Sequence, residues 1–149
     1  MKRKKFDFIK PTIIFSVIGI FIPGFTAIGI LGIQMLLTSI GIECSNAWNG
    51  IWIFSILSSI ILPLFFYLHI QKINQDKLRN LKIYLNLFNI FEYFLIQASL
   101  SAFFTTGEIL CYGSGGQNGI ELAFSAWLAI PILICFSFIF SKRLNKKIE

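Results

Sequence analysis

The sequence predicts an all-α integral membrane protein, a four-helix bundle that crosses the bilayer four times with its N and C termini in the cytoplasm. Three observations support this prediction. Of the 149 residues, 56% are hydrophobic and 13% are charged, and the mean hydropathy is +0.76, which lies outside the range of soluble domains. The hydrophobic residues form four long runs. The Lys and Arg residues lie in three clusters at the ends of these runs.

The four apolar runs cover residues 11–37, 50–70, 81–104 and 120–141. Each is long enough to cross the hydrocarbon core, which takes roughly 20 residues of helix. Helices are expected because a backbone in lipid must satisfy its own hydrogen bonds, and the runs lack the alternation of barrel strands. Residues 1–149 should therefore form a single transmembrane domain. A cleavable signal peptide is disfavoured, since its apolar region would span about 7–15 residues.

Orientation follows from the basic residues, because short cytoplasmic loops retain Lys and Arg whereas translocated loops avoid them. All thirteen flank three positions, namely the N-terminus, the connection between the second and third runs, and the C-terminus: Lys2, Arg3, Lys4, Lys5, Lys10, Lys72, Lys77, Arg79, Lys82, Lys142, Arg143, Lys146 and Lys147. The loops at 38–49 and 105–119 contain none. This pattern predicts a multi-pass protein of the bacterial plasma (inner) membrane. It does not indicate a nucleic-acid partner, whose binding would spread basic residues over a folded surface.

The two halves of the sequence are alike in outline. Each has an outgoing run, an external loop with one cysteine, and a returning run with a proline. The equivalent positions are Cys44 and Cys111, Asn49 and Asn118, Pro63 and Pro131, and Lys72 and Lys142. This correspondence indicates a parallel repeat of a two-helix hairpin. Independent helix starts with similar capping residues explain it equally well.

Glu92 is the sharpest candidate for a functional residue. It follows Lys82 by ten residues, which places it roughly 15 Å into the third run and close to the bilayer centre. A charged carboxyl at that depth costs free energy, so a protonated form is expected. A polar stripe with a spacing of three or four residues accompanies it on one helical face. Its members are Asn86, Asn89, Tyr93, Gln97 and Ser101.

Two interpretations of this intramembrane polar site stay open. In the first, Glu92 is a protonatable group in a small transporter or proton path. In the second, its neutral carboxyl hydrogen-bonds to an amide or hydroxyl and holds the bundle together or contacts a partner. Asn89, one turn earlier, is the nearest such group. Because no second acid or base lies at that depth to form a relay, the second interpretation is favoured.

The first run carries small residues along one face, Ser16, Gly19, Pro23 and Ala27, a pattern that permits close contact between helices. Pro23 and Gly24 should kink this helix near its middle, because proline cannot donate the backbone hydrogen bond that a helix interior needs. Pro63 and Pro131 should have the same effect in the returning helices.

Cys44 and Cys111 both fall in the predicted external loops, where the compartment is oxidising, so a disulfide between them is expected. Closing a loop of this length would contribute about 4 kcal/mol. Quinone-linked thiol oxidases and vitamin K epoxide reductases use a C-x-x-C pair, which the sequence around Cys44 lacks, so a redox function is a weaker hypothesis. No cofactor is indicated, and a metal site is not expected because His69 is the sole histidine.

No catalytic pair lies within the runs, and the two aspartates, Asp7 and Asp76, fall on the cytoplasmic side. The sequence therefore predicts a protein that is not an enzyme. The first hypothesis is contact between its helices and another membrane protein or a second copy of itself. Immunity proteins that protect against pore-forming bacteriocins share this general plan, an analogy of architecture. The alternative is a small transporter or channel subunit in which Glu92 titrates.

Overall fold

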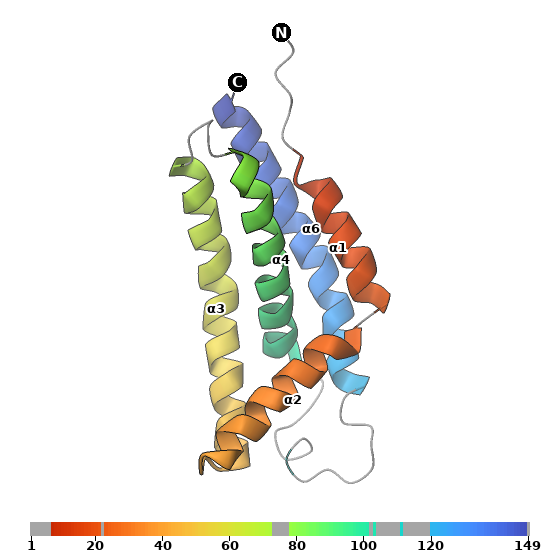
Figure 1. The fold of residues 1–149 in the computed structure, drawn as a ribbon, viewed down its shortest axis with the longest axis vertical. Coiled ribbons are helices and arrows are strands. Elements are labelled where there is room, and N and C mark those ends of the chain that lie inside the picture. Colours follow the sequence, from red (N-terminus) through yellow and green to blue (C-terminus); the bar gives the residue numbers. More distant parts are fainter. Residues whose placement is uncertain are drawn as a thin grey trace.

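The computed structural model describes residues 7–21, 23–72, 78–101, 103, 111 and 120–148. These residues form five helices and no strand: α1 (Ile9–Phe21), α2 (Pro23–Ser39), α3 (Cys44–Lys72), α4 (Leu78–Ser101) and α6 (Ile120–Ile148). The long helices α3, α4 and α6 run alongside one another (Figure 1). The start of α1 and the end of α6 lie at one end of the bundle, called here the terminal end. The opposite end is called the disulfide end.

The structure describes the first apolar run as two helices and not as the one kinked helix that the sequence suggested: α1 ends at Phe21 and α2 begins at Pro23. Figure 1 shows α1 lying along α6, whereas α2 crosses the bundle obliquely toward α3. Proline is favoured in the first turn of a helix, where its missing N–H is not needed, and disfavoured in a helix interior. Pro23 therefore begins a new helix at this position instead of bending the first one.

The other helices extend beyond or stop short of the apolar runs. α3 begins at Cys44 instead of residue 50, and α6 continues to Ile148 instead of 141, while α4 starts and ends three residues earlier than predicted. Hydropathy predicts which residues suit lipid, whereas the first and last residues of a helix depend on local capping interactions. Pro63 and Pro131 both lie inside continuous helices.

Local caps explain two of the helix ends. Asp7 Oδ1 accepts hydrogen bonds from the backbone N–H of Ile9 and Lys10 at 2.8 and 3.4 Å, and so caps the start of α1. At the end of α2, Gly41 has a positive φ of 95°. Its N–H bonds to Thr38 O at 3.0 Å, and the N–H of Ile42 bonds to Leu37 O at 3.2 Å. This is a Schellman motif, in which glycine supplies the left-handed residue that reverses the chain.

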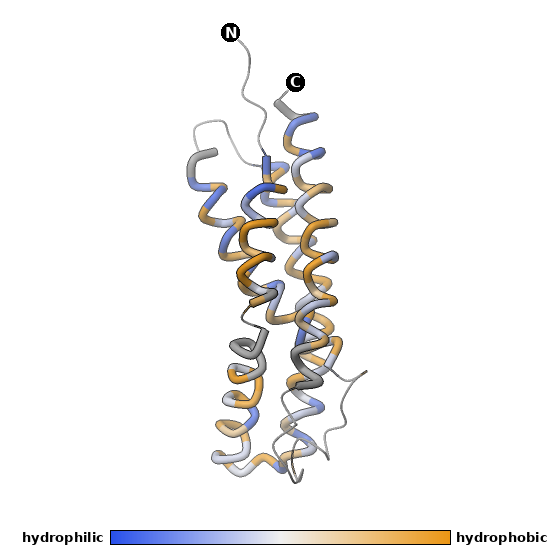
Figure 2. Tube along the Cα trace, turned by 90° about the vertical axis from the view of Figure 1, so that its right-hand side faces the viewer, coloured by the Kyte–Doolittle hydropathy of each residue, from blue (hydrophilic) through white to orange (hydrophobic). Residues whose placement is uncertain are grey.

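The surface of the described helices is rich in apolar side chains, and the interior contains polar side chains beside apolar ones. Large apolar side chains along the helices are exposed, for example Phe21 at 80%, Ile28 at 71% and Phe54 at 67%. Many of the buried side chains are polar: Thr12, Ser16, Gln34, Ser55, Asn89, Glu92, Gln97, Ser101, Ser125, Ser137 and Ser141. Figure 2 shows hydrophobic residues along the helices and hydrophilic residues gathered toward the terminal end. In water such a surface would associate or aggregate.

Two helical segments, Cys44–Lys72 and Phe124–Lys146, are long and apolar enough to cross a membrane by length and composition. They pack with α4 around an aromatic core, in which the Phe66 ring stacks on Phe88 at 4.7 Å and meets Phe140 at 4.9 Å. A smaller apolar cluster of Ile30, Trp48, Ile51 and Ala98 joins α2, α3 and α4. The polar residues lie between these apolar contacts.

Candidate functional site

The polar face of α4 points into the bundle. Asn89, Glu92 and Gln97 have no exposed surface, and Tyr93 is 4% exposed. Ser101 is also buried, with its hydroxyl bonded to Ala98 O. Four members of the predicted stripe and Glu92 therefore face the interior.

Asn86 does not belong to this cluster, because its side chain is exposed. The buried residues of α4 follow a ridge with a spacing of four: Leu81, Leu85, Asn89, Tyr93, Gln97 and Ser101. Each step of four residues turns about 40° more than a full helical turn, so the buried face winds slowly around the helix. Asn86 lies one residue beyond this ridge and is turned about 100° away from Leu85.

A chain of hydrogen bonds joins α4 to α1 and α6. Asn89 Nδ2 donates to Thr12 Oγ1 at 3.0 Å. The same Thr12 oxygen lies 2.6 Å from Ser137 Oγ. One turn closer to the terminal end, the Phe8 N–H donates to Ser141 Oγ at 3.0 Å. Three helices are therefore connected through side chains that are inaccessible to solvent or lipid.

Thr12 was not among the residues that the sequence singled out. Its spacing of four from Ser16 and seven from Gly19 places it on the same face of α1, so the small-residue pattern could have been extended by one turn to find it. In the structure, α1 supplies the partner of Asn89.

Tyr93 makes a close contact between α4 and α1. Its hydroxyl donates to Gly19 O at 3.2 Å, and its ring makes an edge contact with Phe15, with centroids 5.7 Å apart. A Cβ added at Gly19 would lie 3.2 Å from the Tyr93 hydroxyl oxygen. The absence of a side chain at Gly19 therefore permits this contact, as expected for a small-residue face.

Glu92 has no hydrogen-bond partner within the described part of the chain. Neither Oε1 nor Oε2 is paired, and the same holds for Asn89 Oδ1 and Ser16 Oγ. The sequence suggested that the Asn89 amide would bond to the Glu92 carboxyl. That expectation is wrong in this structure, because Asn89 Nδ2 donates to Thr12 instead. A buried polar group without a partner is costly, so this cluster needs a physical explanation.

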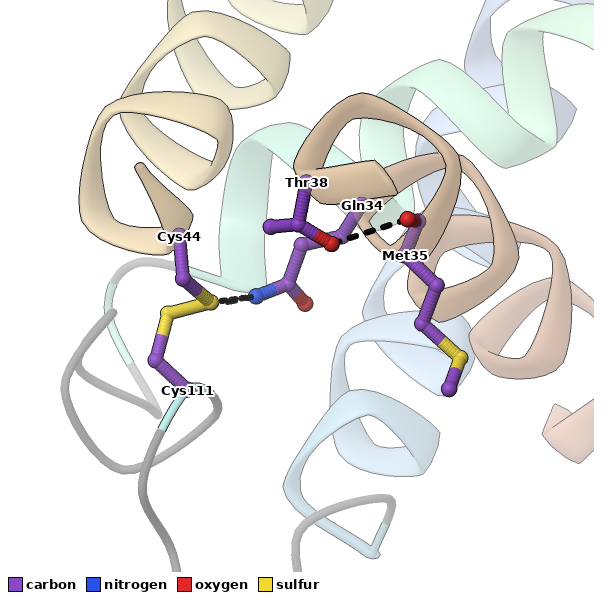
Figure 3. Close-up of a disulfide and its surroundings, with 5 residues drawn as sticks. All are labelled: Gln34, Met35, Thr38, Cys44 and Cys111. Atoms are coloured by element: carbon purple, nitrogen blue, oxygen red, sulfur yellow. Dashed lines mark hydrogen bonds between the residues drawn. A yellow bond between two sulfur atoms is a disulfide. The ribbon is translucent and has the colours of Figure 1, made fainter. Parts of the chain in front are cut away.

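The cysteines Cys44 and Cys111 form a second feature, at the disulfide end. Cys44 and Cys111 are joined by a disulfide with a Cα–Cα distance of 5.7 Å, as the sequence predicts. Gln34 Nε2 lies 2.7 Å from Cys44 Sγ and 3.2 Å from Cys111 Sγ, and Figure 3 shows the Gln34 amide pointing at the disulfide. α2 is thereby attached to the start of α3. Cys135 is free and exposed on α6.

A third feature is an apolar groove of about 620 Å³ between α2, α3 and α4. Ile33, Phe54, Ser58, Ile61, Leu62, Phe65, Ile90, Phe91, Phe94 and Leu95 line it. Phe54, Phe65 and Phe91 are more than half exposed. The groove is open to the surroundings of the bundle and contains one hydroxyl, that of Ser58.

The described residues contain no group of three or more His, Cys, Asp or Glu side chains that could hold a metal ion. Comparisons with protein-family models, with curated proteins and with solved structures find no match to this chain. The buried polar cluster, the disulfide and the groove are therefore interpreted by their chemistry alone.

Proposed function

We propose that this chain is a multi-pass protein of the plasma (inner) membrane that acts, without a catalytic site, by contact with a helix of another membrane protein. Four crossings are proposed: α1 with α2, then α3, α4 and α6. The exposed apolar side chains and the buried polar ones support a lipid environment, where exposed Phe and Ile cost nothing and polar groups pack inward. In this arrangement α1 and α2, of 13 and 17 residues, cross the membrane together.

Both termini are proposed to be cytoplasmic. The basic residues of the described helices support this orientation, since Lys10 lies near the start of α1, Lys72 at the end of α3 and Lys82 near the start of α4. The end of α6 adds Lys142, Arg143 and Lys146 at the same end of the bundle. The described turn between α2 and α3 contains no Lys or Arg. Positive charge on one side is the usual mark of the cytoplasmic face.

Reporter fusions test the topology. A fluorescent protein fused after the C-terminus should fluoresce, because it folds in the cytoplasm, and alkaline phosphatase inserted after Gly41 should be active, because it folds outside. The reverse pair of results would overturn the orientation. If alkaline phosphatase fused at the C-terminus were active as well as alkaline phosphatase inserted after Gly41, the even number of crossings would be overturned.

The apolar groove is the observation that carries the contact function. It lies where α3 and α4 are packed on each other but α2 covers them only at one end (Figure 1). Its lining of Phe, Ile and Leu matches the side chains of a membrane helix, and the half-buried hydroxyl of Ser58 offers one hydrogen bond to it. An immunity or accessory protein would use such a surface, because recognition there needs complementary shape and no chemistry.

Site-specific photo-crosslinking in intact cells tests this proposal. Probes at Phe54 and Phe91, which line the groove from two helices, should capture the same membrane protein, identified by mass spectrometry. A probe at Leu128, which is 47% exposed on α6 outside the groove, should not capture it. Ser58→Trp, which fills the groove, should abolish the adduct. Lipid adducts at all three positions would contradict the contact function, and an adduct with a second copy would replace it by self-association.

A second function is favoured by a different observation, the break in the first crossing beside a buried carboxyl. Transporters place their ion sites near the bilayer centre at discontinuous helices. Glu92 is next to Tyr93, which contacts the last turn of α1 through Gly19. A small transporter or channel subunit in which Glu92 takes up a proton would use this arrangement. Glu92→Gln should then abolish proton-coupled flux in vesicles, and unchanged flux would remove this function.

A further inference from the structure

We propose that Glu92, Asn89 and Ser16 together bind a dehydrated monovalent cation of the Na⁺ type, held between α1 and α4 beside the break in the first crossing. This inference rests on the second function above and names the ligand of its site. Unlike that function, it concerns equilibrium binding, so it can be tested without measuring transport.

The chemistry of the unpaired atoms is the first argument. Both Glu92 oxygens, Asn89 Oδ1 and Ser16 Oγ are buried without a hydrogen-bond partner among the described residues. An ionised carboxylate and an amide oxygen only accept, and a hydroxyl oxygen has two lone pairs. The Asn89 amide nitrogen is already bonded to Thr12, so the oxygen is the end of that amide left to serve a ligand. Apart from the O–H of Ser16, which can rotate away, an ionised Glu92 and the Asn89 oxygen offer acceptors only, and such a group suits a cation.

The register of α1 and α4 brings the three residues together. Asn89 is fixed to Thr12 at one contact, and Tyr93, one turn further along α4, is fixed to Gly19, about two turns further along α1. Glu92 lies between the two α4 positions, and Ser16 lies between the two α1 positions. Both are fully or almost fully buried, at 0% and 3% exposure. The three residues therefore lie at or between these two contacts of α1 with α4.

Charge decides the valence. Glu92 is the sole Asp, Glu, Lys, Arg or His among the described buried residues, so the site supplies one negative charge. A monovalent cation makes the site neutral. A divalent ion would leave an uncompensated positive charge in a low-dielectric interior, which costs several kcal/mol or more.

The helix break adds a favourable field. The last carbonyls of α1 have no partner within that helix, and the C-terminal end of a helix carries partial negative charge. One of these carbonyls, Gly19 O, faces Tyr93 of α4. Cation sites in transporters are formed by such half-helix ends together with side-chain oxygens. α1 therefore presents its negative end at the level of Glu92.

The test is thermal unfolding of the full-length protein in detergent, followed by tryptophan fluorescence, as choline chloride is replaced by NaCl at constant ionic strength. Na⁺ should raise Tm with the logarithm of its concentration once it exceeds Kd, by about 5 °C at a concentration near 100 times Kd. Glu92→Gln should abolish the rise, whereas the same substitution at the exposed Glu43 should leave it unchanged. Ser16→Ala should shift the onset of the rise to at least tenfold higher Na⁺, and Ser59→Ala should not.

Four outcomes are distinguishable. A rise in Tm with Na⁺ that needs Glu92 supports the cation site, even if vesicles show no flux, in which case the site is structural and the transport function fails. Equal Tm in NaCl and choline chloride overturns the site. Proton-coupled flux without a Na⁺ response also overturns it but leaves the transport function standing. An equal Na⁺ response in the wild type and Glu92→Gln overturns it too, because the ion then binds elsewhere.

Discussion

Replacing Thr12 by Val should destabilise the bundle by about 1–3 kcal/mol. The substitution keeps the branched shape and removes the oxygen that joins Asn89 at 3.0 Å and Ser137 at 2.6 Å. Hydrogen bonds between membrane helices contribute on average roughly 0.6 kcal/mol each and at most about 1.7. The loss also leaves the Asn89 amide buried and unpaired, and such a group costs about 1–3 kcal/mol. Because the cost of the orphaned amide already includes the bond that it loses, this cost sets the predicted range.

The measurement is reversible unfolding in mixed micelles with increasing dodecyl sulfate, and a matched control is available on α2. Thr38 is only partly buried and bonds to Met35 O within its own helix (Figure 3), so Thr38→Val should change the free energy of unfolding by less than about 0.5 kcal/mol. Combining Thr12→Val with Asn89→Leu should cost less than the sum of the two by about 0.5–2 kcal/mol, because each removes the same bond. Additive effects, or equal effects of the two threonine substitutions, would refute the proposed link between α1 and α4.

Two further outcomes follow from the contacts at other positions. Cys44→Ser should lower the free energy of unfolding by up to about 4 kcal/mol, since the disulfide closes a loop with a sequence separation of 67. Cys135→Ser should leave stability and non-reducing gel mobility unchanged, and an equal loss from both would refute the assignment. Gly19→Ala should destabilise by about 1–3 kcal/mol, because its Cβ would meet the Tyr93 hydroxyl at 3.2 Å. Gly32→Ala, whose Cβ meets nothing within 4 Å, should be neutral or stabilising in the same unfolding assay.

The sequence predicted the all-helical fold, because long apolar runs interrupted by basic and polar segments have few other solutions. It also predicted the Cys44–Cys111 disulfide, since both cysteines fall in loops on the same side of the runs. These predictions depend on composition and on position along the chain. They need no knowledge of which helix packs on which.

The partners of the polar residues could not be predicted, because they depend on the rotation and tilt of neighbouring helices. Spacing alone placed Asn86 with Asn89, although it is the ridge from Leu85 to Asn89 that faces inward. Spacing also paired Asn89 with Glu92, which are one turn apart on the same helix. Thr12, on a helix that is distant in sequence, offers a better approach to the Asn89 amide, and only the packing of α1 against α4 brings it there.

The change from α1 to α2 and the winding of the buried ridge on α4 have the same cause. Up to Tyr93, α4 is covered by α1 through Thr12 and Gly19. Beyond Tyr93, α4 is covered by α2. A Cβ at Gly29 would lie 3.0 Å from Phe94, and Ile30 packs in the cluster that contains Ala98. One straight helix could not follow a buried face that winds around α4, whereas two helices with different tilts can. Glu92 lies where the cover passes from α1 to α2, and this is the level at which α1 ends and its carbonyls lack helical partners. The position of Glu92 and the boundary between α1 and α2 therefore form one structural feature, and the cation experiment tests both.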